Sequence, residues 1–347
     1  MITATYNTIL VVVVAAALLR ARRTQAILPS VALLFCLAAV APAVLLGEDE
    51  FGVLRLLAYG IFVHGVLLAA GTAALARRSA RGARAAVAAL AVVLLAVGVD
   101  AFVIEPRWLT ISRVVIPSAK VTRPLRIVVL ADLQMDAFGD YERAALTAAM
   151  AERPDLILMP GDYIQQADDA RFAAARDALQ AHLRAIAFSA PLGVYAVQGN
   201  IERPRWTELF QGLPVTVFPV TGTLDREELS ITGLDLEDSF NETLEIAPSR
   251  RFHIVVGHGP DFALGNIQAD LLVAGHTHGG QVVLPLIGPL ITLSKVPRSW
   301  AAGTTHLPGD RTLVVSRGIG MERAHAPRLR FLCRPEIVVI EVTPAKT

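Results

Sequence analysis

The sequence has few cysteines, few charged residues and no excess of charge of either sign. Only Cys36 and Cys333 occur among 347 residues. They lie in regions of different composition, so neither a disulfide framework nor a thiolate metal site is expected. Charged residues make up 18% of the chain and the net charge is +1, so no basic excess points to nucleic acid. The 54% hydrophobic content is that of a folded chain rather than a disordered one.

The scarcity of charge is confined to the N-terminal part of the chain. Residues 1–104 carry 8 Lys and Arg and 4 Asp and Glu, whereas the rest carries 24 and 27. The first part is too apolar for a soluble domain, and the second has the composition and length of one globular domain. We therefore expect a transmembrane region over 1–104, a connector over 105–124 and a soluble domain over 125–345.

Four apolar runs lie in the N-terminal region, each close to the roughly 20 residues that span a bilayer. They are Thr8–Leu19, which could begin as early as Ile2, and Ala26–Leu46, Val53–Leu75 and Ala85–Ile104. The first is the weakest because Thr3, Thr5 and Asn7 dilute it. These runs largely lack the polar face of a soluble amphipathic helix, so about four transmembrane helices are predicted.

The segments between these runs alternate in charge, which predicts an orientation. Arginines follow the first and third runs, and acidic residues follow the second: Arg20, Arg22, Arg23, Arg77, Arg78, Arg81 and Arg84 against Glu48, Asp49 and Glu50. Cytoplasmic loops carry the excess of Lys and Arg. The soluble domain is therefore expected outside the cytoplasm, anchored in a bacterial cytoplasmic membrane.

The second half alternates short β-rich runs with helical stretches, which predicts an α/β fold with a largely parallel central sheet. Helices are expected over Tyr141–Ala151 and Ala170–Ile186, and hairpins after Val215. The expected strands are Leu125–Leu130, Leu156–Met159, Val194–Val197, Phe252–Val256, Leu271–Ala274, Thr312–Val315 and Glu336–Val342.

Polar residues follow five of these strands directly. They are Asp132 and Gln134, Asp162, Asn200, His258, and His276 with His278. Ligand sites in α/β sheets lie beyond the carboxyl ends of strands, so these side chains are expected to converge. Carboxylate, amide and imidazole ligands without thiolate suit Mn, Fe, Zn or Co. Seven ligands exceed the need of one such ion, and two-metal sites are suited to displacement at phosphorus.

The same residues in the same order resemble the calcineurin-like metallophosphoesterase family, whose pattern is D-x-H, G-D, G-N-H-[DE], G-H and G-H-x-H. The matching segments are Asp132-Leu133-Gln134, Gly161-Asp162, Gly199-Asn200-Ile201-Glu202, Gly257-His258 and Gly275-His276-Thr277-His278. The resemblance covers roughly Leu125 to Thr343 and looks closest to the bacterial membrane-associated branch, which includes enzymes that act on lipid-linked pyrophosphates. It implies an α/β sandwich with mixed central sheets.

The resemblance also implies roles for individual residues. Asp132, Gln134, Asp162 and His278 would hold one divalent ion, and Asn200, His258 and His276 would join a bridging Asp162 on a second, the ions being Mn, Fe, Zn or Mg. Asp162, Asn200 and His276 would carry the catalytic work. Asp136, Tyr163, Glu202 and Arg317 lie on the same loops and are expected to support the ligands or the phosphate.

Two positions depart from the family pattern. Gln134 replaces a metal-binding His, and its carbonyl oxygen is a weaker donor than imidazole for zinc or iron. Ile201 replaces the His that follows Asn200 and can neither orient a phosphate nor protonate a leaving oxygen. We therefore expect a loosely held first ion, or Mn or Mg there, and slow hydrolysis of poor leaving groups.

Two functions from different classes fit these observations. The first is a membrane-anchored hydrolase of a phosphodiester or pyrophosphate, whose phosphorylated substrate is lipid-linked or soluble. The alternative is a sensory or scaffold protein that retains metal and phosphate affinity but has lost most turnover through Gln134 and Ile201. The apolar segment Val282–Thr305 is either a wall near the membrane or a plain surface loop.

Overall fold

The structure is a computed structural model that describes residues 2–23, 28–47, 49–75 and 81–345, with side chains 21–33 left out. The chain forms two compact units. The first holds Met1–Ile104 with Glu322–Arg328, and the second holds Glu105–Met321 with Leu329–Thr347. Among the residues behind the orientation prediction, Glu48, Arg77 and Arg78 lie outside the described part, as do the side chains of Arg22 and Arg23.

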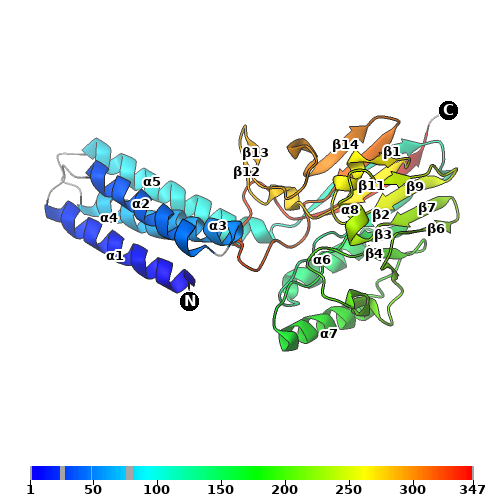
Figure 1. Cartoon of the computed structure of the whole chain (residues 1–347), viewed down its shortest axis with the longest axis horizontal. Helices are drawn as coiled ribbons and strands as arrows, with labels where there is room; N and C mark the ends of the chain where they lie inside the picture. Colours follow the sequence, from blue (N-terminus) through cyan, green and yellow to red (C-terminus); the bar gives the residue numbers. More distant parts are fainter. Residues whose placement is uncertain (1, 24–27, 48, 76–80, 346–347) are drawn as a thin grey trace. The chain divides into compact units, whose positions relative to one another are not determined.

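The first unit consists of helices (Figure 1). Helix α3 continues without a break through a π-helical segment, η2, into α4. Helix α5 continues in the same way into the π-helical segment η4. Their bounds are α1 Ile2–Arg23, α2 Leu28–Leu46, α3 Glu50–Tyr59, η2 Gly60–Gly65, α4 Val66–Leu75, α5 Arg81–Val99 and η4 Asp100–Ile104.

Three helices of the described chain are long and apolar enough to cross a membrane: Ile2–Arg20, Glu50–Leu75 and Arg81–Arg107. Four were predicted. The second predicted span is present as helix α2, whose described side chains cover only Leu34–Leu46, a shorter apolar helix. Three of the four predicted spans are therefore candidates by length and composition among the described residues.

Small and aromatic side chains form the core of this unit: Tyr6, Leu10, Ala39, Ala43 and Leu56. Two polar side chains of the first run, Tyr6 and Asn7, have partners inside this unit. The Tyr6 hydroxyl donates to the Ala39 carbonyl at 3.0 Å, and Asn7 Oδ1 lies 2.9 Å from His64 Nε2. Asn7 thus gives one nitrogen of the buried His64 ring a partner inside the bundle.

The unit is completed by the segment Glu322–Arg328 at the turn between α2 and α3. Asp49 caps α3 by accepting from Gly52 N at 2.6 Å, and its other oxygen lies 2.9 Å from His325 Nδ1. Arg55 Nη1 donates to the Ala324 carbonyl at 3.3 Å. The polar start of α3 is thus joined to a short segment far along the chain.

The second unit contains two six-stranded mixed sheets (Figure 1). In order, the first is β1 Thr110–Ser118, β16 Glu336–Pro344, β2 Leu125–Val129, β3 Leu156–Met159, β4 Val194–Val197 and β5 Thr216–Phe218. The second is β14 Gly303–Leu307, β15 Arg311–Val315, β11 Leu271–Ala274, β9 Phe252–Val256, β7 Leu229–Gly233 and β6 Gly222–Arg226.

Shorter elements complete the unit. Two small pairs join β8 Glu245–Ile246 with β10 Asn266–Ile267, and β12 Val283–Leu284 with β13 Gly288–Pro289. The helices are α6 Asp140–Ala151, α7 Asp169–Ala185 and α8 Leu236–Ser239, with single turns η5 Glu105–Arg107, η6 Trp206–Phe210, η7 Asp261–Leu264, η8 His278–Gly280 and η9 Arg298–Trp300.

Strand alternation divides the apolar side chains between separate cores. In β2, Ile127 and Val129 pack in a core that includes Ile254 and Val273 of the second sheet, whereas Val128 faces a core shared with α6 and α7. Successive side chains of a strand point to opposite faces, so one buried run serves both layers. The result is an α/β sandwich of two mixed sheets.

β1 lies within the stretch expected to be a connector. It pairs in parallel with β16 over nine residues, from Thr110 opposite Glu336 to Ser118 opposite Pro344. The stretch alternates half-buried and exposed residues, which is the pattern of an edge strand. Its exposed positions are Ile111, Arg113, Val115 and Pro117, so the sequence of this strand shows no polar and apolar alternation that would have identified it.

Candidate metal centre

The predicted ligands lie on the loops that follow strands of both sheets. Asp132 and Gln134 follow β2, Asp162 follows β3 and Asn200 follows β4 in the first sheet. His258 follows β9, and His276 and His278 follow β11, in the second sheet. The strands β2, β3 and β4 are parallel, as are β9 and β11, so their carboxyl ends bring these loops together.

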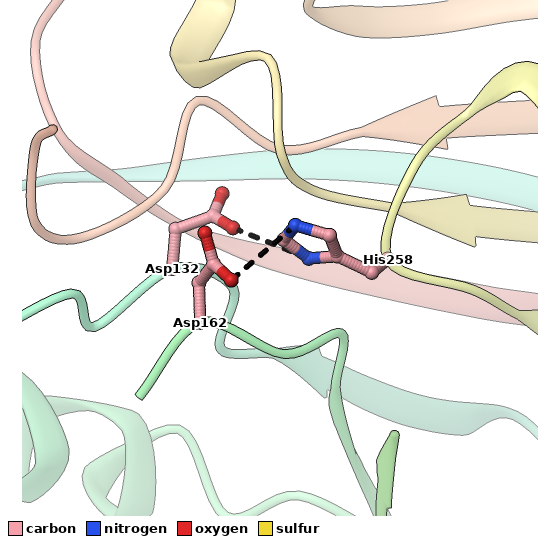
Figure 2. A group of neighbouring side chains, drawn as sticks. All are labelled: Asp132, Asp162 and His258. Carbon is pink, nitrogen blue, oxygen red and sulfur yellow. Dashed lines mark ion pairs between the residues drawn. The ribbon is translucent and has the colours of Figure 1, made fainter. Parts of the chain in front are cut away.

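Three buried side chains form the centre of the site (Figure 2). Asp132, Asp162 and His258 each offer a ligand atom within 4.8 Å of the other two. His258 Nε2 lies 3.4 Å from Asp162 Oδ1, and His258 Nδ1 lies 3.8 Å from Asp132 Oδ1. Figure 2 shows the two carboxylates turned toward the imidazole from the opposite sheet.

Asn200 and His276 extend this centre. Asn200 Oδ1 lies 2.7 Å from His258 Nε2 and 3.1 Å from His276 Nδ1, and these two ring nitrogens are 3.1 Å apart. The other nitrogen of each ring faces a backbone carbonyl, Pro160 O at 2.8 Å for His258 and Leu293 O at 3.1 Å for His276.

Those carbonyls decide where the imidazole lone pairs point. A carbonyl accepts only an N–H, so His258 carries its proton on Nδ1 and His276 carries its proton on Nε2. The remaining nitrogens direct their lone pairs at Asn200 and at each other, which is the arrangement of ligands around a cation. Burial, with His276 nearby, holds the pKa of His258 well below its usual value, so the ring stays neutral and able to ligate.

Glu202 organises the loops beneath the carboxylates. Its side chain accepts from the backbone N–H of Gly199 at 2.6 Å, of Tyr163 at 2.6 Å and of Asp162 at 3.2 Å. Burial raises the pKa of Glu202 to about 7, although these N–H donors favour the ionised form. Glu202 therefore ties the β3 and β4 loops together without pointing at the ligand atoms.

The backbone at the site adopts conformations that side chains rarely take. Five of the seven predicted ligands have positive φ: Asp132 at 49°, Gln134 at 34°, Asp162 at 58°, His276 at 69° and His278 at 48°. Such conformations cost of order 1–3 kcal/mol each and persist where the surrounding structure demands them, typically at ligand clamps. The fold thus accepts strain in order to direct these side chains inward.

Two glycines allow the loops to approach the carboxylates. A Cβ atom on Gly199 would lie 2.1 Å from Asp162 Oδ1, and one on Gly275 would lie 2.8 Å from both carboxylate oxygens of Asp132. No side chain fits either position without moving the aspartate. Glycine is therefore required for steric reasons at these two positions, each of which directly precedes a ligand in the sequence motifs.

Gln134 and His278 contact neighbours on the same loops. Gln134 donates from its backbone N to the Asp162 carbonyl at 2.8 Å and from Nε2 to Gln165 Oε1 at 3.1 Å. His278 Nδ1 lies 3.5 Å from Arg330 Nη2. Both side chains are buried, which is compatible with the ligand roles predicted for them.

The predicted supporting residues divide into different roles. The Tyr163 hydroxyl donates to the carbonyls of Met159 and Val197, so it links the ends of strands β3 and β4. Arg317 Nη2 donates to Glu336 Oε2 at 2.7 Å, so its guanidinium pairs with a buried carboxylate. Asp136 is half-buried, and its carbonyl accepts from Gln166.

Sequence reasoning missed Arg330, the largest fully buried side chain. It donates to the Arg317 carbonyl at 2.7 Å and the Cys333 carbonyl at 3.0 Å, and it also reaches the Gly320 carbonyl. Gly320 N in turn donates to the Asp132 carbonyl at 2.7 Å. A basic residue in an irregular tail carries no local signal of burial, so only the folded chain reveals this role.

The residues present fit divalent metal ions. The set joins two buried carboxylates with imidazole and amide donors, which Mn, Fe and Zn accept. Two carboxylates withdrawn from water are costly without a compensating cation. The one nearby thiol, Cys333, donates to the His278 carbonyl at 3.2 Å, which leaves it outside the ligand set.

Comparison with known proteins establishes the family of the chain. The model of the calcineurin-like phosphoesterase family matches residues 125–280. The chain is 30% identical over 235 residues to the metallophosphoesterase YkuE of Bacillus subtilis, covering 62% of this chain and 77% of that protein. It is 30% identical over 255 residues to the phosphodiesterase YaeI of Escherichia coli, covering 69% and 90%. The chain belongs to the calcineurin-like metallophosphoesterase family.

Membership confirms the predicted fold class and reaction class. The residues that the family model matches lie in the second unit, which we call the phosphoesterase domain, and the protein is a metal-dependent phosphoester hydrolase. Among solved structures, the phosphoesterase YfcE of Escherichia coli is 15% identical, with a TM-score of 0.31 over 59% of this chain and 85% of that one.

Proposed function

We propose that this metallophosphoesterase is anchored in a membrane by its own helices and uses two divalent ions to hydrolyse a phosphodiester or pyrophosphate of a lipid-linked substrate. The observation that carries the two-ion proposal is the position of His258. Its Nε2 lies near Asp162, Asn200 and His276, and its Nδ1 lies 3.8 Å from Asp132 Oδ1, so this one ring contacts residues of both predicted ligand groups.

The two groups of ligands meet at Asp162. Asp132, Asp162, Gln134 and His278 would hold one ion, and Asp162, Asn200, His258 and His276 would hold the other. Ions bound there would lower the pKa of water and neutralise phosphate oxygens. Asp162 is fixed for a bridging role because its Oδ1 accepts from Ile201 N at 3.2 Å while Glu202 holds its backbone N–H.

The departures from the family pattern restrict the preferred substrate. Ile201 offers no proton for the leaving oxygen, so the leaving group must stabilise its own charge. A phosphate leaving from a pyrophosphate does so by delocalisation, whereas an alkoxide does not. The site therefore favours a pyrophosphate or an activated diester over a simple alkyl ester.

The anchor favours a substrate that is confined to a membrane. The described helices offer three candidate spans, and the last, Arg81–Arg107, leads directly into the phosphoesterase domain. The arginines at the junction of the last two candidate spans, Arg77, Arg78, Arg81 and Arg84, favour a cytoplasmic position for that loop and therefore a domain outside the cytoplasm. A lipid-linked phosphate of the cell envelope is the substrate class that this location supplies.

Turnover by the full chain in detergent tests the proposal. We expect Mn-dependent hydrolysis of bis(nitrophenyl) phosphate and of a lipid-linked pyrophosphate. Asp162→Asn should lower both by more than about 100-fold, because it removes the shared carboxylate. The matched control is Asp225→Asn, which changes an exposed aspartate paired with Arg251.

Metal binding without turnover on either substrate would contradict the proposal and favour the sensory or scaffold alternative. The departures at Gln134 and Ile201 are the specific observations behind that alternative. Equal losses in Asp162→Asn and Asp225→Asn would show that the measured activity does not depend on this centre.

A further inference from the structure

An apolar hairpin projects beside the metal centre. It is formed by β12 and β13 (Figure 1). Leu286 is 108% exposed and Ile287 is 61% exposed. Full burial of such a side chain is worth about 1.5–3 kcal/mol, so two of them held in water at a hairpin tip mark an interaction surface.

The base of the hairpin is hydrogen-bonded to a segment near the C-terminus. That segment in turn contacts the residue that follows the last apolar helix. Val283 N donates to the Phe331 carbonyl at 2.9 Å, and Phe331 N donates to the Gln281 carbonyl at 3.0 Å. The next residues, Leu332 and Cys333, donate their backbone N–H groups to the Glu105 carboxylate. Glu105 directly follows Ile104, the last residue of the final helix.

Two further exposed apolar side chains lie on the two segments that meet at these contacts. Leu332 is 54% exposed and Trp108 is 50% exposed. The guanidinium of Arg334 lies 3.5 Å from the centroid of the Trp108 ring. A tryptophan just beyond a membrane span, covered by an arginine, is typical of a residue at the level of the lipid headgroups.

The charge distribution suits an anionic lipid surface. Asp270 and Asp310 enclose a stretch that contains no Asp or Glu, and its charged residues, Lys295 and Arg298, are basic. The hairpin lies within this stretch. Carboxylates would be repelled by anionic headgroups, whereas Lys and Arg are attracted to them.

We propose that the tip of this hairpin, Leu286 and Ile287, inserts into the bilayer that holds the chain's own helices, with Trp108 and Leu332 at the headgroup level. This inference rests on the membrane anchoring in the proposed function. A convex tip requires no complementary pocket, and a fluid bilayer accommodates it without one. The tether at Glu105 keeps that bilayer close to the hairpin at all times.

Insertion would set the depth of the metal centre. His276 Nε2 donates to the carbonyl of Leu293, which follows β13 on the same segment. A Cβ atom on Gly280 would lie 2.3 Å from Pro289 Cβ, so the turn after His278 packs directly on the hairpin. A hairpin seated among lipids holds the ligands beside the phosphates of the membrane surface, where a lipid-linked substrate presents its reacting bond.

The depth of the tip can be measured in the full chain reconstituted in phosphatidylcholine and phosphatidylglycerol vesicles. A Cys36→Ala background leaves the buried Cys333 as the remaining thiol. Leu286→Cys labelled with an environment-sensitive dye should be quenched by spin-labelled lipids. The matched control is Val220→Cys, because Val220 is a 66% exposed aliphatic residue between β5 and β6. Equal, weak quenching at both positions would overturn the proposal.

Activity provides a second, independent readout. Leu286→Asp combined with Ile287→Asp should lower the ratio of lipid-linked to soluble substrate turnover by about tenfold or more, because it removes the insertion of two apolar side chains. Val220→Asp should leave that ratio unchanged. An unchanged ratio in the double variant would overturn the proposed link between insertion and substrate access.

The two experiments separate this inference from the proposed function. Lipid-linked turnover without quenching at position 286 would overturn the inference and leave the proposed function standing. Quenching at position 286 without turnover of the lipid-linked substrate would support the inference and contradict the proposed substrate class.

Discussion

At the scale of single residues, the site is distinguished by what stands at position 201. The backbone N–H of Ile201 donates to Asp162, so the residue keeps its place in the loop, but its side chain is apolar. General acid assistance is typically worth about 100-fold to 10,000-fold. The loop geometry is retained while one chemical function is missing.

Ile201→His should restore part of that function. We expect a gain of up to about 100-fold on an alkyl phosphodiester and a smaller gain on a nitrophenyl ester, because only the alkoxide needs a proton. Steady-state rates with Mn on both esters measure the difference, and Ile201→Val is the control for loop packing. A larger gain on the nitrophenyl ester would count against general acid assistance at this position.

Gly199→Ala should disable the centre through sterics. The added Cβ would lie 2.1 Å from Asp162 Oδ1, so the carboxylate must move. A displacement of about 1 Å at a reacting centre can cost about 100-fold in rate, and we expect a loss of at least that size on bis(nitrophenyl) phosphate.

Gly222→Ala is the matched control for this loss. The nearest atom to its added Cβ would lie 3.9 Å away, which is ordinary contact, and we expect its rate to equal that of the unmodified protein. Retained activity in Gly199→Ala would show that Asp162 is not held as tightly as the structure indicates.

At the scale of elements, each strand both packs a core and positions a ligand at its carboxyl end. β9 illustrates this: Ile254 and Val256 are buried between the sheets, and His258 follows two residues later. A second histidine of β9, His253, has its Nε2 2.8 Å from Thr232 Oγ1 of the neighbouring strand β7. Its imidazole therefore makes a contact between strands and is not a metal ligand.

The buried His253 should make the stability of the phosphoesterase domain depend on pH. Burial lowers the pKa of His253 below its usual value of 6.5, so the unfolded chain binds the proton more tightly. Stability from this group is therefore present above pH 6.5 and is lost as the pH falls below that value.

His253→Gln removes the titrating group while keeping a polar side chain that can reach Thr232. We expect the fall in Tm between about pH 7.5 and about pH 5 to be smaller in the variant by about 1–3 °C. Thermal unfolding of the full chain in detergent, followed by the signal of the phosphoesterase domain, measures this difference. Equal falls in both proteins would exclude His253 as a source of acid sensitivity.

At the scale of the whole molecule, an apolar helical unit is joined to a domain of ordinary composition. Arg81 and Arg84 lie in the first turn of the last candidate span, Arg81–Arg107, and Asp49 caps the start of the preceding span, Glu50–Leu75. This distribution of charge predicts that Arg84 faces the cytoplasm and that the phosphoesterase domain does not.

Cysteine labelling tests that orientation. In a Cys36→Ala background, Val220→Cys should react with a membrane-impermeant maleimide in intact spheroplasts, whereas Arg84→Cys should react only after lysis. Both residues are exposed in the structure, so a difference in labelling reports the side of the membrane. Labelling of position 84 but not of position 220 in intact spheroplasts would reverse the orientation.

The sequence alone determined the division of the chain into an apolar N-terminal region and a soluble domain. It also determined the strands that carry ligands and the order of the ligand motifs. These features are local: hydrophobic runs, strand periodicity and short polar segments after strands can be read without knowing what packs on what. The fold class and the family followed from them, and both were confirmed. β1 was missed because its residues, which include Pro117, show no polar and apolar alternation of a half-buried strand.

Only the tertiary structure decided how the ligands are held. The tautomers of His258 and His276 depend on the carbonyls of Pro160 and Leu293, each far from its histidine along the chain or on another loop. Arg317 proved to be bound to Glu336, and Arg330 proved to be buried. Such contacts join segments that only folding brings together, and the sequence carries no local trace of them.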